Sequence, residues 1–394
     1  MASASAANSF AILGAPPEFD QPLEGKQDYW PSWGQYEAAF RGIFSRQYYT
    51  NQGPLTARLE ERLSTVFRVK HAVCVTNTTI ALIMAAEAMG LQGRVIVPAL
   101  ASISVLQSLA WVSLKPIFCD VDPTTHQIDI DEVAARLKID GGDIAAILAV
   151  NLWGNVCDAA ALRHCANKYG VRLYFDSVHA FGNVVNGIPV GNVGDVEVFS
   201  LHAGRIMGGA EGGFLCTNDD ILAARLRNIR SSYGAGPPVA VVKTSNGRMS
   251  EAQAALGLLH LDDFSRLQSS NQKLFHKYEI GLSGIPGLRL LKPRGMDSGN
   301  YAYVVCEIEE RQFGLTRDRL LAVLIAENIN ARGYVCFDTV LGEERPYAFP
   351  RATQASHNSF QLPLGADVSE QAVERVCRRI GAAQAHAGEI RSVR

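Results

Sequence analysis

Four polar segments of the sequence carry side chains that can bind anions or move protons. The first is "FSLHAGRIMGGAEGG" at residues 199–213, a glycine-rich stretch that contains Ser200, His202 and Arg205. A reactive lysine would be expected in such a loop, but this segment contains no lysine. A guanidinium stays protonated and binds carboxylates or phosphates as a fork of donors. An imidazole titrates near neutral pH, so His202 is either a proton-transfer group or a packed side chain.

The other three segments offer groups for an anion and for a ring nitrogen. "VTNTTIAL" runs from a strand into a helix, where Thr78, Thr79 and the backbone N–H groups either hold a phosphate or form an ordinary helix cap. "YFDSVHAFG" ends a strand with Asp176, which either caps a helix or accepts a hydrogen bond from a ligand ring, and His179 follows. "TSNGRMSEAQAALG" places Asn246 just ahead of a helix.

These segments follow strand candidates that alternate with helices between residues 55 and 265. Short apolar runs such as "HAVCVT", "RVIVP", "IAAILAV" and "VRLYFD" are separated by amphipathic stretches. Buried strands that alternate with helices predict an α/β fold with a mainly parallel sheet covered on both faces. Ligands of such sheets bind at the carboxyl ends of the strands, where the polar segments lie.

The pattern divides the chain into three parts. Residues 1–54 are rich in aromatics and prolines and predict an irregular N-terminal arm. Residues 55–275 form the large domain with the parallel sheet. Residues 276–394 contain one clear strand and two helical stretches, which predicts a smaller α+β domain.

Composition excludes several classes of function. The net charge of −2, from 37 basic and 39 acidic residues, leaves no basic surface for nucleic acid or an anionic membrane. None of the eight cysteines forms a CxxC pair with zinc spacing, so we expect no metal site and buried free thiols in a reducing compartment. The N-terminus lacks the features of a signal peptide, and we expect a cytoplasmic protein.

Taken in order and spacing, the segments resemble the DegT-type sugar aminotransferases, which depend on pyridoxal phosphate (PLP) and have fold type I. The resemblance runs over nearly the whole chain and implies a fold type I large domain followed by a small α+β domain. The segments that carry it are "TNQGPLTARLEERL", "VIVPAL", "KPIFCDVDP", "NLWGNVCD", "DSVHAFG", "FSLHAG", "EGGFLCTND" and "NGRMSEAQAALG".

The resemblance implies a role for each polar residue. Asp176 would pair with the protonated pyridine nitrogen and keep the ring an electron sink, and His179 would lie over the ring. Asn246 would reach the phosphate from the neighbouring subunit, which implies a homodimer with shared active sites. The phosphate would be held by Thr78, Thr79 and Ser200.

The sequence departs from this family at the residue that forms the Schiff base. Aligning Ser200 and "EGG" without a gap places Arg205 on the family's lysine. Arginine is a poor nucleophile that stays charged, so ordinary transamination through it should be absent or very slow. Lys243 is either a substitute amine or a solvated loop residue.

Three hypotheses follow from the departure. The chain is a divergent enzyme of specialised or sugar metabolism that binds PLP or pyridoxamine phosphate (PMP) non-covalently. It would then perform dehydratase-like or condensation-type chemistry on a nucleotide sugar or a small amino or keto acid, with His202 or His179 as base. Alternatively it is a cofactor-free enzyme or a catalytically silent subunit. The third hypothesis is an ordinary nucleotide-sugar aminotransferase with an introduced replacement at Arg205.

Overall fold

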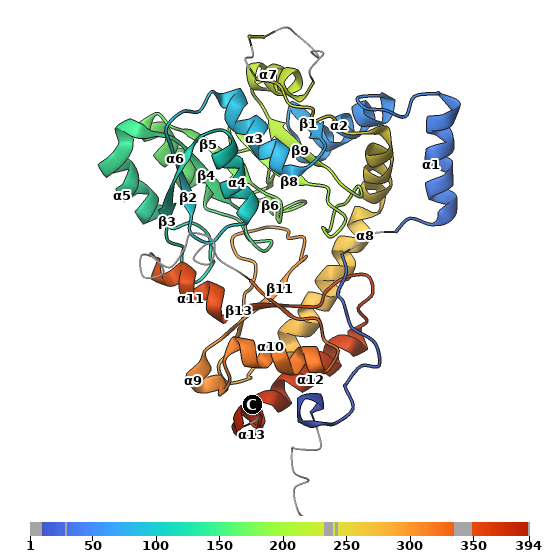
Figure 1. Ribbon diagram of the computed structural model, residues 1–394, viewed down its shortest axis with the longest axis vertical. Coiled ribbons are helices and arrows are strands. Elements are labelled where there is room, and N and C mark those ends of the chain that lie inside the picture. Colours follow the sequence, from blue (N-terminus) through green and yellow to red (C-terminus); the bar gives the residue numbers. More distant parts are fainter. Residues whose placement is uncertain (1–9, 28–29, 232–238, 241–242, 335–348, 393–394) are drawn as a thin grey trace, which may run out of the picture. The chain divides into compact units, whose positions relative to one another are not determined.

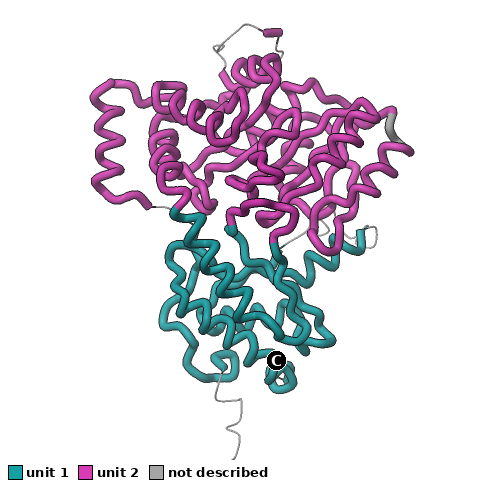
Figure 2. Tube along the Cα trace, turned by 180° about the vertical axis from the view of Figure 1, so that it is seen from behind, with its two compact units in different colours: residues 1–27, 266–292, 301–394 teal, residues 28–265, 293–300 magenta. Residues whose placement is uncertain are grey.

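The computed structural model describes residues 10–27, 30–231, 239–240, 243–334 and 349–392. The chain forms two compact units, shown in different colours in Figure 2. Unit 1 comprises residues 1–27, 266–292 and 301–394, and unit 2 comprises residues 28–265 and 293–300. The first 27 residues therefore group with the C-terminal part of the chain.

Unit 2 is built on a seven-stranded sheet in its described residues, with the order β1-β9-β8-β5-β4-β2-β3. Neighbours from β3 to β8 are parallel, whereas β9 runs antiparallel to both β8 and β1. This confirms the mainly parallel sheet. The strands are β1 His71–Val75, β2 Arg94–Pro98, β3 Lys115–Cys119, β4 Ile144–Val150, β5 Arg172–Asp176, β8 Val196–Ser200 and β9 Gly213–Thr217.

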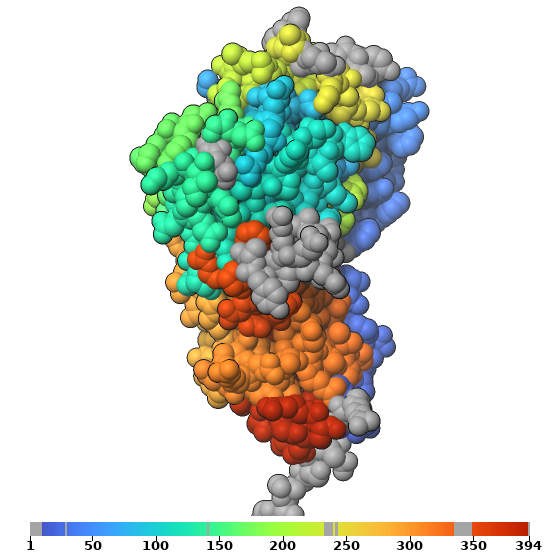
Figure 3. All heavy atoms as spheres, turned by 60° about the vertical axis from the view of Figure 1, so that its left-hand side comes forward, coloured from blue at the N-terminus to red at the C-terminus, as the bar shows by residue number. Residues whose placement is uncertain are grey.

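Helices that alternate with the strands cover this sheet (Figure 1). They are α2 Pro54–Phe67, α3 Thr78–Met89, α4 Ile103–Trp111, α5 Ile130–Asp140, α6 Ala159–Tyr169 and α7 Asp220–Arg230. The helices α5 and α6 pack against each other, and α3 packs against α4 and α7. Figure 3 shows the outer surface of α3 and α4 in blue to teal. A short hairpin of β6 Val184–Val185 and β7 Ile188–Pro189 lies outside the main sheet.

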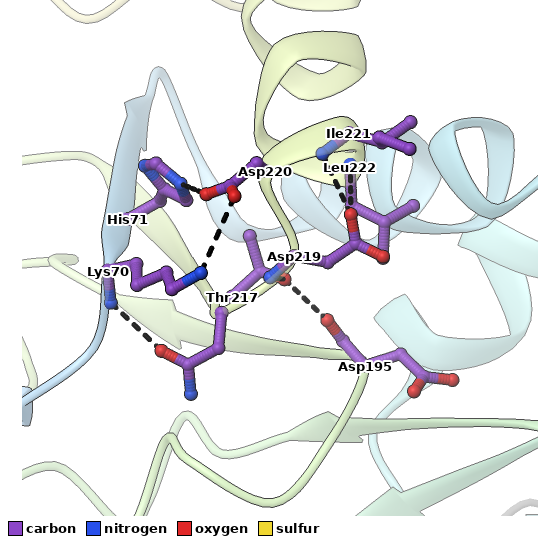
Figure 4. A network of polar contacts seen from close by, with 9 residues as sticks. Lys70, His71, Asp195, Thr217, Asp219, Asp220, Ile221 and Leu222 are labelled. Carbon is purple, nitrogen blue, oxygen red and sulfur yellow. Dashed lines mark hydrogen bonds and ion pairs between the residues drawn. The ribbon is translucent and has the colours of Figure 1, made fainter.

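The N-terminus of α7 is fixed by a polar network between three segments (Figure 4). The Asp219 carboxylate accepts hydrogen bonds from the backbone N–H groups of Ile221 and Leu222 at 2.8 and 3.0 Å. The next residue, Asp220, lies 2.8 Å from Nε2 of His71 at the start of β1. A capping carboxylate satisfies first-turn amides and favours the positive helix end, so these contacts define where α7 begins.

The N-terminal segment is more regular than the sequence predicted. Residues Trp33–Ser45 form helix α1, and Ala11–Leu13 form a short 3-10 helix, so the expectation of an irregular arm over residues 1–54 is wrong there. Ser32 and Gln35 form a capping box, in which each side chain bonds the other residue's backbone N–H. The Ser-x-x-Gln spacing was a signal for this helix that aromatic and proline content obscured.

Unit 1 contains a four-stranded antiparallel sheet in its described residues, with the order β10-β11-β13-β12. The strands are β10 Leu288–Leu290, β11 Val304–Ile308, β12 Arg332–Gly333 and β13 Ser359–Leu362. The helices are α9 Glu310–Phe313, α10 Arg317–Ala326, α11 Pro350–Asn358, α12 Glu370–Ala385 and α13 Ala387–Ser392. The long helix α8, Glu251–Gly281, begins in unit 2 and continues into unit 1. A C-terminal antiparallel sheet with helices confirms the expected α+β class.

Seven cysteines in the described residues are free and buried, as expected, and Cys336 lies outside those residues. Burial raises the pKa of the Cys119 and Cys157 thiols to about 12, so both are protonated at neutral pH. Across the described helices, none combines the length and the apolar character that a membrane crossing requires.

Candidate active site

The polar segments meet at one edge of the sheet of unit 2. Because β1 and β8 both pair antiparallel with β9, they run in the same direction, and β5 runs parallel to β8. Their carboxyl ends therefore lie at one edge, where Asp176 ends β5 and Ser200 ends β8. Gly213, the first residue of β9, pairs with both Val75 and Ser200 and joins the two strand ends.

A pocket of about 430 Å³ opens at this edge. It brings together five of the residues singled out from the sequence, and among the described residues its lining includes no lysine. Glu211 is a lining residue that the sequence analysis did not select. The lining residues are Thr76, Asn77, Thr78, Thr79, Ser200, His202, Arg205 and Glu211.

The threonines lie in the first turn of α3. Asn77 caps this helix, and its side chain accepts a hydrogen bond from Ile80 N at 2.9 Å. The first amides of a helix have no intrahelical acceptors, and the helix dipole places partial positive charge there. Together with the guanidinium of Arg205 on the same pocket, the N-terminus of α3 forms a cradle that suits a phosphate group.

A side chain at position 213 would crowd the backbone of this cradle. An added Cβ would lie 3.0 Å from Phe199 O, 3.1 Å from Asn77 C and 3.2 Å from Thr78 N. All three neighbours are backbone atoms, so the strand and the helix start would have to separate.

We therefore expect Gly213→Ala to weaken phosphate binding at the α3 cradle, because the strand and the helix start must shift, and to lower folding stability by about 1–3 kcal/mol, the usual cost of overpacking. Isothermal titration of the variant with PMP measures the loss of binding. The same replacement at Gly142, where a Cβ meets no atom within 4 Å, is the matched control. Equal affinities for the two variants would contradict the proposed position of the phosphate.

Asp176 supplies a buried carboxyl group beside the cradle. Its side chain is 4% exposed and Oδ1 accepts a hydrogen bond from Val178 N at 3.1 Å. Burial raises the pKa of Asp176 to about 6, although the Val178 amide and the positive charge of Arg205 act in the opposite direction. A buried carboxyl group with few stabilising contacts favours a cationic partner, which the protonated nitrogen of a pyridine ring would provide.

Like Asp176, His179 is not a lining residue of the pocket, and its ring presents a donor rather than a basic nitrogen. Its Nδ1 accepts the backbone N–H of Trp153 at 3.1 Å, so the neutral ring carries its proton on Nε2. Burial and the charge of Arg205 both hold the pKa of His179 well below its ordinary value. The side chain therefore stays neutral and offers an N–H to an oxygen acceptor, which fits the expected position over a ring bearing a hydroxyl group.

His202 is also held through its Nδ1. This atom accepts the backbone N–H of Gly204 at 3.1 Å, and Nε2 lies 3.5 Å from Oε1 of Glu211. Both side chains are 57% exposed and line the pocket. The neutral imidazole thus carries a proton on Nε2, directed toward a carboxylate. The neutral ring can donate a hydrogen bond through Nε2, and it can act as a general acid once it has taken up a second proton as the imidazolium.

A buried network behind Asp176 holds the end of its strand. Asn151 Nδ2 donates to Ser177 Oγ at 2.9 Å, and Ser177 Oγ donates to Glu197 Oε2 at 3.2 Å. Asn151 N also donates to Asp176 O at 2.9 Å. This network was not predicted from the sequence, although Glu197 within the apolar strand "VEVFS" was a signal for a buried charge.

Asn246 does not line this pocket. Its Oδ1 accepts hydrogen bonds from the guanidinium of Arg248 at 2.6 and 2.9 Å, and its side chain is exposed. Lys243 also lies elsewhere, with Nζ 2.8 Å from Oε1 of Glu87 and 66% of its side chain exposed. The pocket thus gathers the anion-binding groups and excludes the lysine considered as a substitute amine.

The fold is that of a family of sugar-modifying transferases. The model of the DegT/DnrJ/EryC1/StrS aminotransferase family matches residues 34–381, and the chain belongs to this family. It is 29% identical over 348 residues to the dTDP-4-amino-4,6-dideoxy-D-glucose transaminase of Shigella dysenteriae, covering 86% of this chain and 92% of that protein.

Solved structures give the same result. A structure of DesI in the presence of its TDP-sugar product is 33% identical, with a TM-score of 0.92 over 98% of this chain and 99% of that chain. The PMP form of the putative sugar aminotransferase Spr1654 from Streptococcus pneumoniae shares the fold at 20% identity. Its TM-score is 0.82 over 95% of this chain and 100% of that chain.

Proposed function

We propose that this chain binds PLP or PMP without a covalent link to lysine and acts on a nucleotide sugar. The reaction would be dehydratase-like or of the condensation type rather than ordinary amine transfer. DesI was solved with a TDP-sugar product, and the Shigella relative is a transaminase of a dTDP-sugar, which supports the substrate class. Membership of the family supports PLP or PMP as the cofactor, and the pocket lining, which contains Arg205 and no lysine among the described residues, supports binding without a covalent link.

One observation carries the proposal: Arg205 lines the pocket, in the loop where the resemblance implies the family's lysine. The loop aligns without a gap between Ser200 and "EGG", and the positive charge of Arg205 acts on both Asp176 and His179. Its guanidinium therefore belongs to the same site as the carboxyl and imidazole groups. A group that stays protonated cannot form the covalent bond that a neutral lysine amine forms.

The residues fit a phosphorylated pyridine ring at both ends. Thr78, Thr79 and Ser200 would hold the phosphate, and Asp176 would pair with the ring nitrogen. When bound, the cofactor supplies an electron sink for bonds that form or break at the substrate carbon next to the amine. His179 would donate its Nε2 proton to the ring oxygen.

Arg205 and His202 would have separate roles. Arg205 would bind a carboxylate or phosphate, including the phosphate of the cofactor at the α3 cradle, as a fork donor, which leaves it no role in proton transfer. In its imidazolium form, His202 would give a proton to a departing oxygen and become the neutral imidazole, because removal of a hydroxyl group needs a general acid. Glu211, 3.5 Å from Nε2, would stabilise the imidazolium before that proton is given up.

The proposal includes a homodimer in which Asn246 completes the neighbouring site. Asn246 is exposed and lies outside the pocket of its own chain, which supports a contact with another copy. Trp33, Phe44 and Tyr49 of α1 and the segment after it are 73%, 70% and 66% exposed, an unusual amount of apolar surface for a monomer.

Equilibrium dialysis of the purified protein with PMP tests the proposal. We expect saturable binding at one site per chain, complete release on dilution, and loss of affinity on replacing Arg205 with glutamine. The replacement removes one charge-assisted contact, so the loss should be about 1.5–3 kcal/mol. Absence of PMP binding by the unmodified chain would favour the cofactor-free enzyme or the silent subunit instead.

A further inference from the structure

The loop that carries Arg205 is folded on itself before it meets the rest of unit 2. Gly209 N donates to Leu201 O at 2.6 Å, and Ala203 N donates to Ala210 O at 3.0 Å. These bonds close residues 201–210 into a hairpin-like turn between β8 and β9. A contact at one side of such a turn constrains the other side, where Arg205 faces the pocket.

Three residues on one face of α8 contact this turn. Gln253, Gly257 and His260 stand at positions i, i+4 and i+7, which share one side of a helix. Gln253 Nε2 donates to Glu211 O at 3.0 Å. A Cβ added at Gly209 would lie 3.0 Å from Gln253 O and 3.5 Å from Gly257 N, so loop backbone and helix backbone touch at glycines.

His260 makes the side-chain contact at the far end of this face. The residue is 2% exposed, and its Nδ1 lies 2.7 Å from Gly208 N and 3.0 Å from Gly208 O. One tautomer accepts the amide proton and the other donates to the carbonyl, so either form tethers Gly208. Burial lowers the pKa of His260 to about 4, against the opposing effects of nearby carbonyl groups and Asp263. The ring is therefore neutral across the physiological range.

We infer that His260 is a positioning residue that holds the turn of residues 201–210 on α8 and thereby keeps Arg205 at the pocket. The inference rests on the proposed function for what Arg205 binds, and on geometry alone for the tether. A lysine in this loop would be held in place by its covalent bond to the cofactor, so its backbone would not have to fix the direction of the side chain. An arginine that binds an anion through two donors needs its backbone held in place.

Hydrogen exchange by mass spectrometry on the cofactor-free chain tests the tether directly. We expect His260→Leu to accelerate exchange of the peptide covering residues 202–211 about tenfold, since a buried amide loses its partner. His260→Asn retains a donor and an acceptor near the Nδ1 position and should restore protection to within about threefold. Leu261→Ala, a buried neighbour on α8, is the matched control, which should lower the melting temperature without selective exchange in this peptide.

Titration with inorganic phosphate then connects the tether to the site. We expect the affinity of His260→Leu to fall several-fold and that of His260→Asn to stay near the unmodified value. Unchanged exchange in His260→Leu, or equal behaviour of the leucine and asparagine variants, would overturn the inference. If the unmodified chain bound neither phosphate nor PMP while the exchange pattern held, the proposed function would fail and the tether would stand.

Discussion

Replacing Arg205 with lysine is expected to convert reversible cofactor binding into a covalent link. The lysine amine can lose its proton and form a bond to the PLP aldehyde, which the guanidinium cannot. The pocket already holds the phosphate cradle, and Asp176 ends β5 at the same sheet edge, so the new amine would meet a bound ring. We expect an absorbance band near the visible edge in the PLP complex, and retention of cofactor mass on the chain after borohydride reduction.

Two controls separate the explanations of the Arg205 result. Arg205→Gln removes the charge without adding an amine and should show neither the absorbance band nor the added mass. The rate of amine transfer from glutamate by Arg205→Lys distinguishes a site in which only the lysine was replaced from a site whose other residues have also diverged. Recovery of full transaminase activity would favour an ordinary aminotransferase whose lysine was replaced, whereas a covalent link without turnover would support divergence of the surrounding residues.

Replacing Asp176 with asparagine is expected to change ligand affinity and stability in opposite directions. Loss of the charged partner for the pyridine nitrogen should weaken PMP binding by about 1.5–3 kcal/mol, or roughly 10- to 150-fold. The cofactor-free variant should be more stable than the unmodified chain at pH 8. Its melting temperature and its PMP affinity, measured on one preparation, check both effects.

The sign of the stability effect follows from the raised pKa of Asp176. Folding favours the protonated form of this carboxyl, whose pKa is about 6 in the folded chain against an ordinary value of 3.8. Its contribution to stability is present below the ordinary value and is lost as the pH rises through about 6. Burying the carboxylate at pH 8 thus costs on the order of 2–3 kcal/mol, which asparagine avoids.

The pH dependence of binding needs a control because phosphate also titrates near pH 6. PMP affinity of the unmodified chain should rise between pH 5 and 7 as both groups ionise, and that of Asp176→Asn should rise less. Inorganic phosphate lacks the ring, so its affinity should follow the same pH curve in both proteins. Parallel PMP curves would exclude Asp176 as the partner of the ring.

Local patterns predicted the fold and five of the eight pocket residues. Apolar strands ending in polar residues placed Thr78, Thr79 and Ser200 at one sheet edge, and the glycine-rich loop carried His202 and Arg205. The features that were missed depend on contacts between distant segments. The role of each imidazole Nδ1 is fixed by a backbone N–H, for His179 that of Trp153, which no spacing in the sequence reveals.

The contact between α8 and the loop of residues 201–210 was likewise not predictable from the sequence. Gly208 and His260 are 52 positions apart, and their contact emerges only when the helix face and the turn are placed together. Helix α1 is a different case, because its capping box was readable and was outweighed by aromatic and proline content. The raised pKa of Asp176 likewise follows from burial, which composition alone does not determine.

The most direct test of this account is borohydride reduction of the unmodified protein saturated with PLP, followed by peptide mapping. We predict that no peptide from the pocket carries the cofactor, and that dialysis before reduction removes PLP completely. Scattered modification of exposed lysines such as Lys243 would be expected at excess PLP and is scored separately. Stoichiometric cofactor mass on one nitrogen in a pocket peptide would contradict the non-covalent site and return the chain to ordinary amine transfer.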